Sequence, residues 1–162
     1  DLHPVAHSFP TRRSSDLVTQ RYAMVSSEKI VRKFSSLDEY LEVLQKLAKT
    51  PVERFVKDKV LIGSMRYYLQ VSVETCLDVA NHVIASERYR APKDYSDSFA
   101  VLEEEGIIPA DLGARLRQMA KFRNRLVHLY GEIDNRKVHA IVLTDLGDIE
   151  QFRKIIIKRF LS

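Results

Sequence analysis

The residues best suited to chemistry lie close together between positions 121 and 131 of this 162-residue chain, in the stretch Lys-Phe-Arg-Asn-Arg-Leu-Val-His-Leu-Tyr-Gly. Here Arg123, Asn124, His128 and Tyr130 fall within an apolar helical stripe, although packing alone gives a core helix no reason to carry them. An arginine can hold a phosphate in two-point contact, and a histidine can move a proton near neutral pH. The pairing indicates phosphodiester chemistry with Arg123 and His128 as catalytic candidates; from spacing alone, a buried polar pair is the alternative.

The spacing of these candidates limits how they can meet. Five positions place Arg123 and His128 about 140° apart around a regular helix and ~7.5 Å apart along it. They converge only if the helix is irregular, if the long arginine reaches round, or if two chains build the site. Asn124 shares a face with His128, so it can orient the imidazole or touch the ligand. Tyr130 falls near the stripe of Arg123, and an amphipathic core residue is its simplest interpretation.

The pattern Arg-x4-His-x-Tyr, which runs here from Arg123 to Tyr130, resembles the motif of the HEPN ribonucleases and most closely that of their HepT toxin branch. Two further stretches are similar to that family. Residues 78–84 resemble its long second helix, and residues 103–109 resemble its usual approach to the motif helix. The resemblance extends over roughly residues 24–160, with the three motifs in the family's order. It implies an all-α, HEPN-like bundle and a metal-independent endoribonuclease.

The resemblance also implies an assembly and a mechanism. HEPN ribonucleases are homodimers whose motifs meet across a two-fold cleft, so a dimer would supply two copies of His128, one as base for the 2′-hydroxyl and one as acid for the 5′-oxygen. Arg123 would stabilise the charge that builds on the phosphate. Because the 2′-hydroxyl is the nucleophile, DNA should not be cut. We expect no metal and no cofactor, and the carboxylates do not group with histidines at ligand spacing.

A protein partner is implied as well. HepT-branch toxins are typically encoded beside a minimal nucleotidyltransferase antitoxin, which transfers AMP to the motif tyrosine, here Tyr130. A bulky anion beside Arg123 would occupy the phosphate site and repel RNA. Two alternatives stay open. The chain could be a non-catalytic subunit that binds nucleotide or substrate for such a nucleotidyltransferase, or a purely structural helical adaptor.

Several basic residues are candidates for contacts with RNA. Lys121, Arg125 and Arg117, with Arg115, form a basic run that could steer RNA, although solvated helix faces often look the same. A second candidate is the polar link around residues 87–95, where basic and aromatic side chains that could touch bases alternate. Its members are Arg88, Tyr89, Arg90, Lys93 and Tyr95.

The other histidines and the single cysteine have simpler interpretations. His82 could line the same cleft as the motif, or it could be a satisfied core histidine. His139 is most simply a surface residue. Cys76 sits in an apolar helical pattern, so we expect a buried core thiol and not a nucleophile, and one cysteine cannot form an internal disulfide.

Composition is that of a globular protein with one domain. Hydrophobic residues make up 45% and charged residues 30% of the chain, while five glycines and five prolines leave little room for the turns of an all-β fold. No apolar run approaches the ~20 residues that span a membrane. The net charge of +4 permits nucleic acid as a partner. We expect a cytoplasmic protein.

The first seventeen residues differ in composition and periodicity from the rest of the chain. Residues 1–17 lack periodicity, and residues 7–17 resemble the translation of a common short-read sequencing adapter. No apolar segment of a secretory signal is present, which argues against a targeting peptide. We therefore treat residues 1–23 as a non-native or disordered leader, with Met24 as the natural start, and residues 24–162 as the HEPN-like domain.

Hydrophobic periodicity and capping signals predict four long helices and one short one. Their ranges are about 26–49, 50–86, 97–105, 109–131 and 135–160. In the second, Thr50 is the expected cap with Pro51 at the first helical position. Its expected apolar residues include Val56, Val60, Tyr67, Val71, Cys76, Val79 and Val83. Gly63 would serve either a close helix approach or an irregularity.

Overall fold

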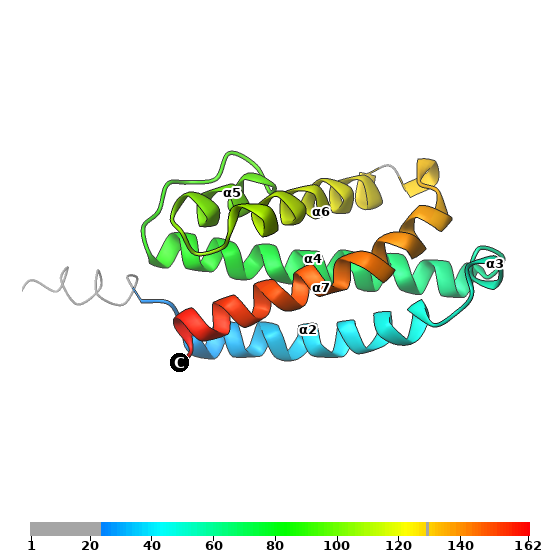
Figure 1. The fold of residues 1–162 in the computed structure, drawn as a ribbon, viewed down its shortest axis with the longest axis horizontal. Coiled ribbons are helices and arrows are strands. Elements are labelled where there is room, and N and C mark those ends of the chain that lie inside the picture. Colours follow the sequence, from blue (N-terminus) through cyan, green and yellow to red (C-terminus); the bar gives the residue numbers. More distant parts are fainter. Residues whose placement is uncertain (1–23, 129) are drawn as a thin grey trace, which may run out of the picture.

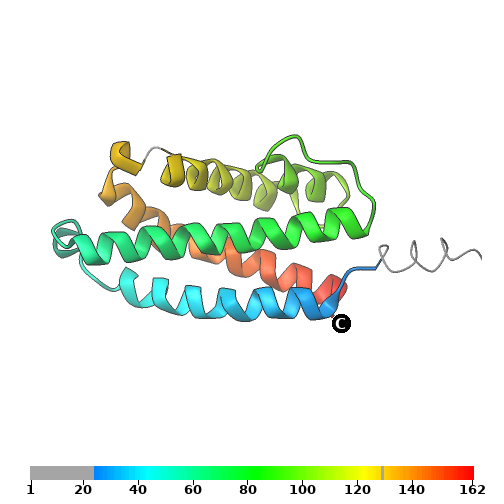
Figure 2. The same ribbon diagram turned by 180° about the vertical axis from the view of Figure 1, so that it is seen from behind.

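The computed structural model describes residues 24–128 and 130–162, and for Tyr130 the backbone alone. Long helices lie nearly side by side, with α4 in the middle, α2 along one flank and α6 along the other (Figure 1). The last helix, α7, crosses one side of this layer. Seen from behind, α4 runs across the near side of the molecule (Figure 2). The described residues contain no strand, so the predicted all-α bundle is confirmed; the leader lies outside the described residues.

The first described helix, α2, spans Ser27–Ala48, one residue inside the predicted range at each end. Ser26 caps it, because the Ser26 hydroxyl accepts the Lys29 N–H at 3.3 Å. Its buried residues recur at steps of four and three, as predicted: Ile30, Phe34, Leu37, Leu41 and Leu44. This stripe packs α2 against α4 and α7.

The predicted single helix over 50–86 is wrong at its start. The chain forms a four-residue helix, α3 (Val52–Phe55), and then begins a new one, α4 (Lys59–Ser86). Thr50 does not cap α3, and no side chain does. Asp58 is the cap that matters, because its Oδ1 accepts the N–H groups of Val60 and Leu61 at 3.0 and 3.1 Å. An extended residue at the cap stops helical propagation and re-aims the chain.

The short helix α5 (Asp97–Glu104) ends as predicted at Gly106, which adopts φ +69° and so releases the chain from the helix. The motif helix, α6, spans Ala110–His128 and ends three residues before the expected terminus at Gly131. A 3₁₀ turn, η1 (Tyr130–Glu132), connects it to α7 (Asn135–Phe160), which Asp134 caps. The motif therefore straddles a helix end.

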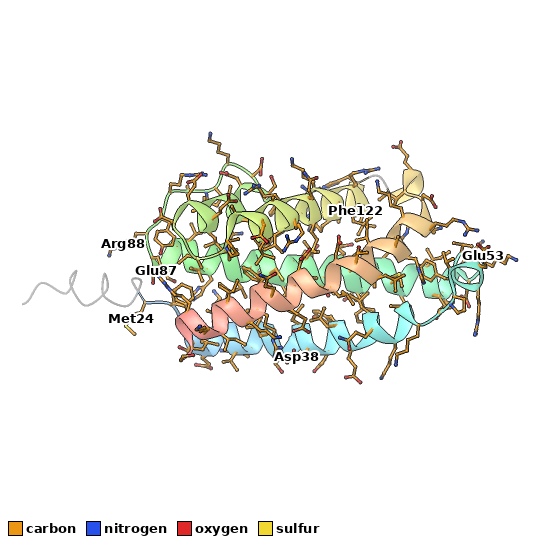
Figure 3. The ribbon with its side chains drawn as sticks, viewed as in Figure 1. Met24, Asp38, Glu53, Glu87, Arg88 and Phe122 are labelled. Atoms are coloured by element: carbon orange, nitrogen blue, oxygen red, sulfur yellow. The ribbon has the colours of Figure 1, made fainter. Side chains whose placement is uncertain are left out.

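His139, which the sequence suggested as a surface residue, is buried. Its Nε2 donates to the carbonyl oxygen of Thr50 at 2.8 Å, and its ring lies 5.1 Å from that of Phe55. Nearby, Glu53 at the end of the molecule (Figure 3) pairs with Arg136 at 2.5 Å. His139 is thus a structural residue that fastens the start of α7 to the turn around α3.

One side of α4 is left open by its neighbours. Val60 and Tyr67, which the sequence suggested as apolar packing residues, are 76% and 55% exposed. Gly63 is exposed between them, and an added Cβ there would meet nothing within 4 Å, so neither explanation offered for Gly63 holds. These residues and Glu74 recur at helical spacing on one face, which we call the open face of α4.

Candidate active site

The site centres on Arg123, whose guanidinium is held by side chains of two helices. Its Nε and Nη2 donate to Oε1 of Glu74 on α4 at 3.0 and 2.5 Å, and its Nη1 donates to Oδ1 of Asn124 at 3.1 Å. Gln70 donates to the same Glu74 oxygen at 3.0 Å. The Arg123 side chain stays 15% exposed. A guanidinium paired with a carboxylate therefore sits at the edge of the core, partly exposed to solvent.

A third segment contacts Arg123 from the link between α4 and α5. Its Cζ lies 5.3 Å from the ring centroid of Tyr95, within cation–π range. The Tyr95 ring is itself more than half exposed. A guanidinium fixed by hydrogen bonds on one side and by an aromatic ring on another can bind a phosphate with little loss of side-chain freedom.

His128 is the last residue of α6, and its side chain is exposed. The helix is α-helical from Arg123 through His128, so the two side chains point to different faces, and Arg123 is turned toward Glu74. Of the three arrangements considered, neither an irregular helix nor an arginine that reaches round describes this chain. The remaining arrangement of the three is a site completed by a second chain.

Asn124 serves Arg123 in this structure. Its Oδ1 accepts from the guanidinium, so the expected contact with the imidazole of His128 is not formed. The side chain of Tyr130 lies outside the described residues. Its backbone begins η1, two residues after His128.

The predicted basic run divides into two groups. Arg115 pairs with Asp111 and Asp148, and Arg117 pairs with Glu103 on α5, so both are engaged within the chain. Lys121 and Arg125 are exposed and have no hydrogen bond or ion pair within the described part of the chain. With Lys137 of α7 they line a hollow of about 380 Å³, and Phe122 (Figure 3) lies among its apolar residues. Lys121, Arg125 and His128 share one face of α6.

The remaining candidates lie elsewhere. His82 does not face the motif; its Nε2 accepts the backbone N–H of Ser26 at 2.9 Å, beside α2. Cys76 is buried, as expected, and burial raises the pKa of its thiol to about 12. In the link, Arg90 is bound by Asp97 and Glu104 at 2.7 Å each, so its guanidinium is engaged within the chain and not offered to bases.

Glu74 and the contact from Tyr95 were missed by sequence reasoning. Glu74 is 49 positions from Arg123, and no periodicity connects two such positions. The usable signal was chemical, since Glu74 and Asp78 are the only acidic residues within the 28-residue helix α4. A carboxylate in so apolar a helix needs a cation as a partner. Arg123 is such a cation, and its own helix likewise mixes apolar and charged residues.

Comparisons with known proteins identify the family of this chain. The profile of the ribonuclease HepT-like family matches residues 37–156. The chain is 34% identical over 103 residues to an mRNA nuclease HepT of Shewanella oneidensis, which covers 64% of this chain and 77% of that protein. A solved structure of the tri-AMPylated Shewanella oneidensis HEPN toxin in complex with MNT antitoxin matches with a TM-score of 0.77 at 28% identity, over 83% of this chain and 100% of that chain.

Two other solved structures share the fold. A toxin–antitoxin complex with AMP-PNP matches with a TM-score of 0.77 at 28% identity, over 82% of this chain and 100% of that chain. A cytosolic Bacillus subtilis protein of unknown function matches with a TM-score of 0.74 at 19% identity, over 84% and 91%. The predicted HEPN-like fold and ribonuclease class are confirmed, and the chain belongs to the ribonuclease HepT-like family.

Proposed function

We propose that this chain is the toxin of a toxin–antitoxin pair, an endoribonuclease that cleaves RNA without a metal ion. The carrying observation is the fixed, partly exposed guanidinium of Arg123, five residues before an exposed histidine, in a chain of this family. The chemistry is attack of the 2′-hydroxyl on the adjacent phosphorus. The bond to the 5′-oxygen breaks, which leaves a 2′,3′-cyclic phosphate and a free 5′-hydroxyl.

Each catalytic role follows from a side chain's chemistry. A neutral His128 takes the proton of the 2′-hydroxyl, and a protonated His128 of the second chain gives a proton to the leaving 5′-oxygen. Arg123 binds the phosphate and stabilises the additional negative charge of the transition state. Asn124 and Glu74 hold Arg123 in place and touch no reacting atom.

A homodimer formed through the open face of α4 would complete this site. This face carries two large exposed side chains, Val60 and Tyr67, with an exposed glycine between them. Glu74 lies on the same face and accepts a hydrogen bond from Arg123, so the face adjoins the site. Exposed apolar side chains along one helix favour burial against another protein surface. In a two-fold dimer the same face of both chains meets, so each Arg123 lies near the dimer axis.

The free cations would lead RNA to this site. Lys121 and Arg125 lie on the same face of α6 as His128 and carry no intrachain partner within the described residues. Lys137 extends the group onto α7. Arg117 contributes less, because its charge is balanced by Glu103. Phosphates bound along this face would align the chain beside His128.

Control by a nucleotidyltransferase antitoxin completes the proposed function. The related Shewanella toxin is tri-AMPylated and bound to an MNT antitoxin. In our proposal the antitoxin transfers AMP from ATP to Tyr130. The tyrosine hydroxyl oxygen forms a bond to the α-phosphorus of ATP and loses its proton, and ATP releases pyrophosphate. The added phosphate lies two residues beyond His128, where its charge competes with RNA for Arg123. The system would act in the cytoplasm, where its RNA substrates are.

The test is an RNA cleavage assay in excess chelator with the wild type and the His128→Ala and Arg123→Ala variants. We expect the wild type alone to produce fragments with 2′,3′-cyclic phosphate ends and to leave DNA of the same sequence intact. Arg115→Ala is the matched control, because that arginine is bound within the chain. Unchanged cleavage by either alanine variant of the motif would sink the proposal. A folded dimer that binds nucleotide and cuts nothing would favour the binding-subunit alternative.

A further inference from the structure

A hollow of about 400 Å³ lies next to Arg123, separated from it by one aromatic ring. Its walls come from α4, α5 and the link between them, and they are Asn81, Pro92, Asp94, Tyr95 and Ser98. Tyr95 belongs to both places, since its ring lies 5.3 Å from the Arg123 Cζ and also lines the hollow. In a nucleotide, one sugar ring separates the base from its phosphate. A hollow so close to a phosphate-binding arginine is therefore placed to receive a base.

Two polar groups in the hollow have unused hydrogen-bonding capacity. The Ser98 hydroxyl donates to Oδ1 of Asn81 at 2.8 Å. The Asn81 amide N–H₂ has no hydrogen-bond partner within the described part of the chain. Oδ1 of Asp94 accepts from the backbone N–H of Asp97 at 2.9 Å and from the Ser96 hydroxyl at 2.8 Å. The backbone N–H of Ser96 also donates to this carboxylate, which as an ionised group has about four acceptor sites in all. The hollow thus offers one donor group and a carboxylate that can accept a further hydrogen bond.

Asp94 is ionised at neutral pH. The N–H of Asp97, and then the hydroxyl of Ser96, lower the pKa of its carboxyl group. An ionised carboxylate accepts hydrogen bonds and donates none, and its bonds to N–H donors are stronger than those of a neutral oxygen. The hollow should therefore prefer a ligand with N–H groups on one side and a carbonyl oxygen beside them.

We propose that this hollow is a base-recognition subsite selective for guanine in the RNA substrate, next to the phosphate held by Arg123. Guanine is the RNA base whose Watson–Crick edge presents two neighbouring N–H donors, N1–H and N2–H, together with a carbonyl, O6. The Asp94 carboxylate accepts from the two donors, the Asn81 amide donates to O6, and Tyr95 stacks on the ring. The proposal rests on the proposed ribonuclease function and adds a specificity to it.

The test uses oligonucleotides of DNA that contain a single ribonucleotide, so that one bond can be cleaved. The base on each side of that bond is varied among guanine, hypoxanthine, adenine, cytosine and uracil. Hypoxanthine retains O6 and N1–H but lacks the N2 amino group. At one of the two positions we expect guanine to be cleaved with kcat/KM about tenfold above hypoxanthine, and further above the other bases.

Variants assign the preference to the hollow. Asp94→Asn keeps an oxygen for the Asp97 N–H, so it should fold as the wild type does, and its guanine-to-hypoxanthine ratio should fall to about one. Glu39→Gln, at an exposed residue of α2, is the matched charge control and should keep the ratio. An unchanged ratio in Asp94→Asn overturns the proposal, and so does a wild type that prefers adenine or shows no preference.

A binding measurement separates this subsite from the proposed activity. Fluorescence anisotropy of the same oligonucleotides with His128→Ala reports recognition without cleavage, and we expect the guanine oligonucleotide to bind about tenfold more tightly than the hypoxanthine one. If the wild type cuts no substrate but this difference holds, the ribonuclease proposal fails and the guanine subsite stands. If cleavage occurs and both oligonucleotides bind equally, the subsite alone fails.

Discussion

Arg123 depends for its position on Glu74, a carboxylate from another helix that contacts it through two hydrogen bonds to one oxygen. We expect Glu74→Ala to lower kcat/KM for RNA by about tenfold or more, because the Arg123 guanidinium is then no longer held at the position where the phosphate binds. The loss should fall mainly on kcat. Initial-rate kinetics with a short RNA provide the measurement.

Glu74→Gln is the control for that change. Its amide oxygen can still accept from the Arg123 Nε, so most of the activity should return. If Glu74→Ala cleaves as fast as the wild type while remaining folded, Glu74 does not position Arg123. If both variants lose activity and stability together, Glu74 is a packing residue instead.

His82 makes stability depend on pH. Burial, and then the charge of Lys29, lower the pKa of its imidazole, and its Nε2 accepts the N–H of Ser26. The His82 imidazole is therefore harder to protonate in the folded state than in the unfolded chain, where its pKa is about 6.5. The stabilisation is present above about pH 6.5 and is lost as the pH falls through the lowered pKa.

Thermal unfolding of the wild type and of His82→Gln, which cannot titrate, measures this effect. Between about pH 7.5 and about pH 5.5, the wild-type Tm should fall further than that of the variant. Parallel curves would show that His82 titrates alike in both states. The imidazole is thus assigned to the α2–α4 contact and not to RNA chemistry.

At the residue scale, the sequence exposed the candidate reacting groups but not the two side chains from other segments that hold Arg123 in place. Arg123 and His128 are recognisable because their chemistry is out of place in an apolar stripe. Glu74 and Tyr95 contribute through packing of α4 and the link against α6, which depends on where distant segments meet. His139 was misjudged for the same reason, because its partner is the backbone carbonyl of Thr50 on the far side of the turn.

At the element scale, the break before α4 makes a specific prediction. Asp58 caps α4 by accepting two backbone N–H groups. Asp58→Ala should lower the free energy of unfolding by about 1 kcal/mol, because these N–H groups lose their partner. Urea unfolding measures it, and Lys57→Ala, at the exposed neighbouring position, is the control. An Asp58→Ala protein as stable as the Lys57→Ala one would contradict this role.

Helix boundaries were predictable where a local signal decides them. Ser26 and Gly106 set the start of α2 and the end of α5 by their own backbone and side-chain chemistry. The apolar period continues across residues 56–60, so it hid the break that Asp58 makes. The motif helix was extended too far for a similar reason: its stripe continues to Tyr130, but the α-helix ends at His128.

At the scale of the whole molecule, we propose that the open face of α4 forms the dimer contact. Val60 and Tyr67 fit the apolar period of α4 but lie exposed, a difference that periodicity cannot show because it does not say which neighbours cover a helix. Within the described residues, no helix is long and apolar enough to cross a membrane. Val60 and Tyr67 are the residues at which the proposed dimer contact is tested.

A charge placed on this face should separate the dimer. We expect Tyr67→Glu to yield monomers in analytical ultracentrifugation and to abolish RNA cleavage, since two like charges would meet near the two-fold axis. Leu143→Glu is the matched control, because Leu143 is also a large exposed apolar residue but lies on α7. Its dimers and activity should persist. A Tyr67→Glu monomer with full activity would remove the dimer from the mechanism.

Mixed dimers show whether two copies of His128 act in one RNA-cleaving site. Wild type and His128→Ala are unfolded and refolded together at fixed total concentration, and cleavage is measured as the wild-type fraction changes. If both histidines are needed, activity follows the square of that fraction, with about one quarter left in an equal mixture. A linear fall, with about one half left, would contradict the account, because each chain would then cleave RNA with its own histidine.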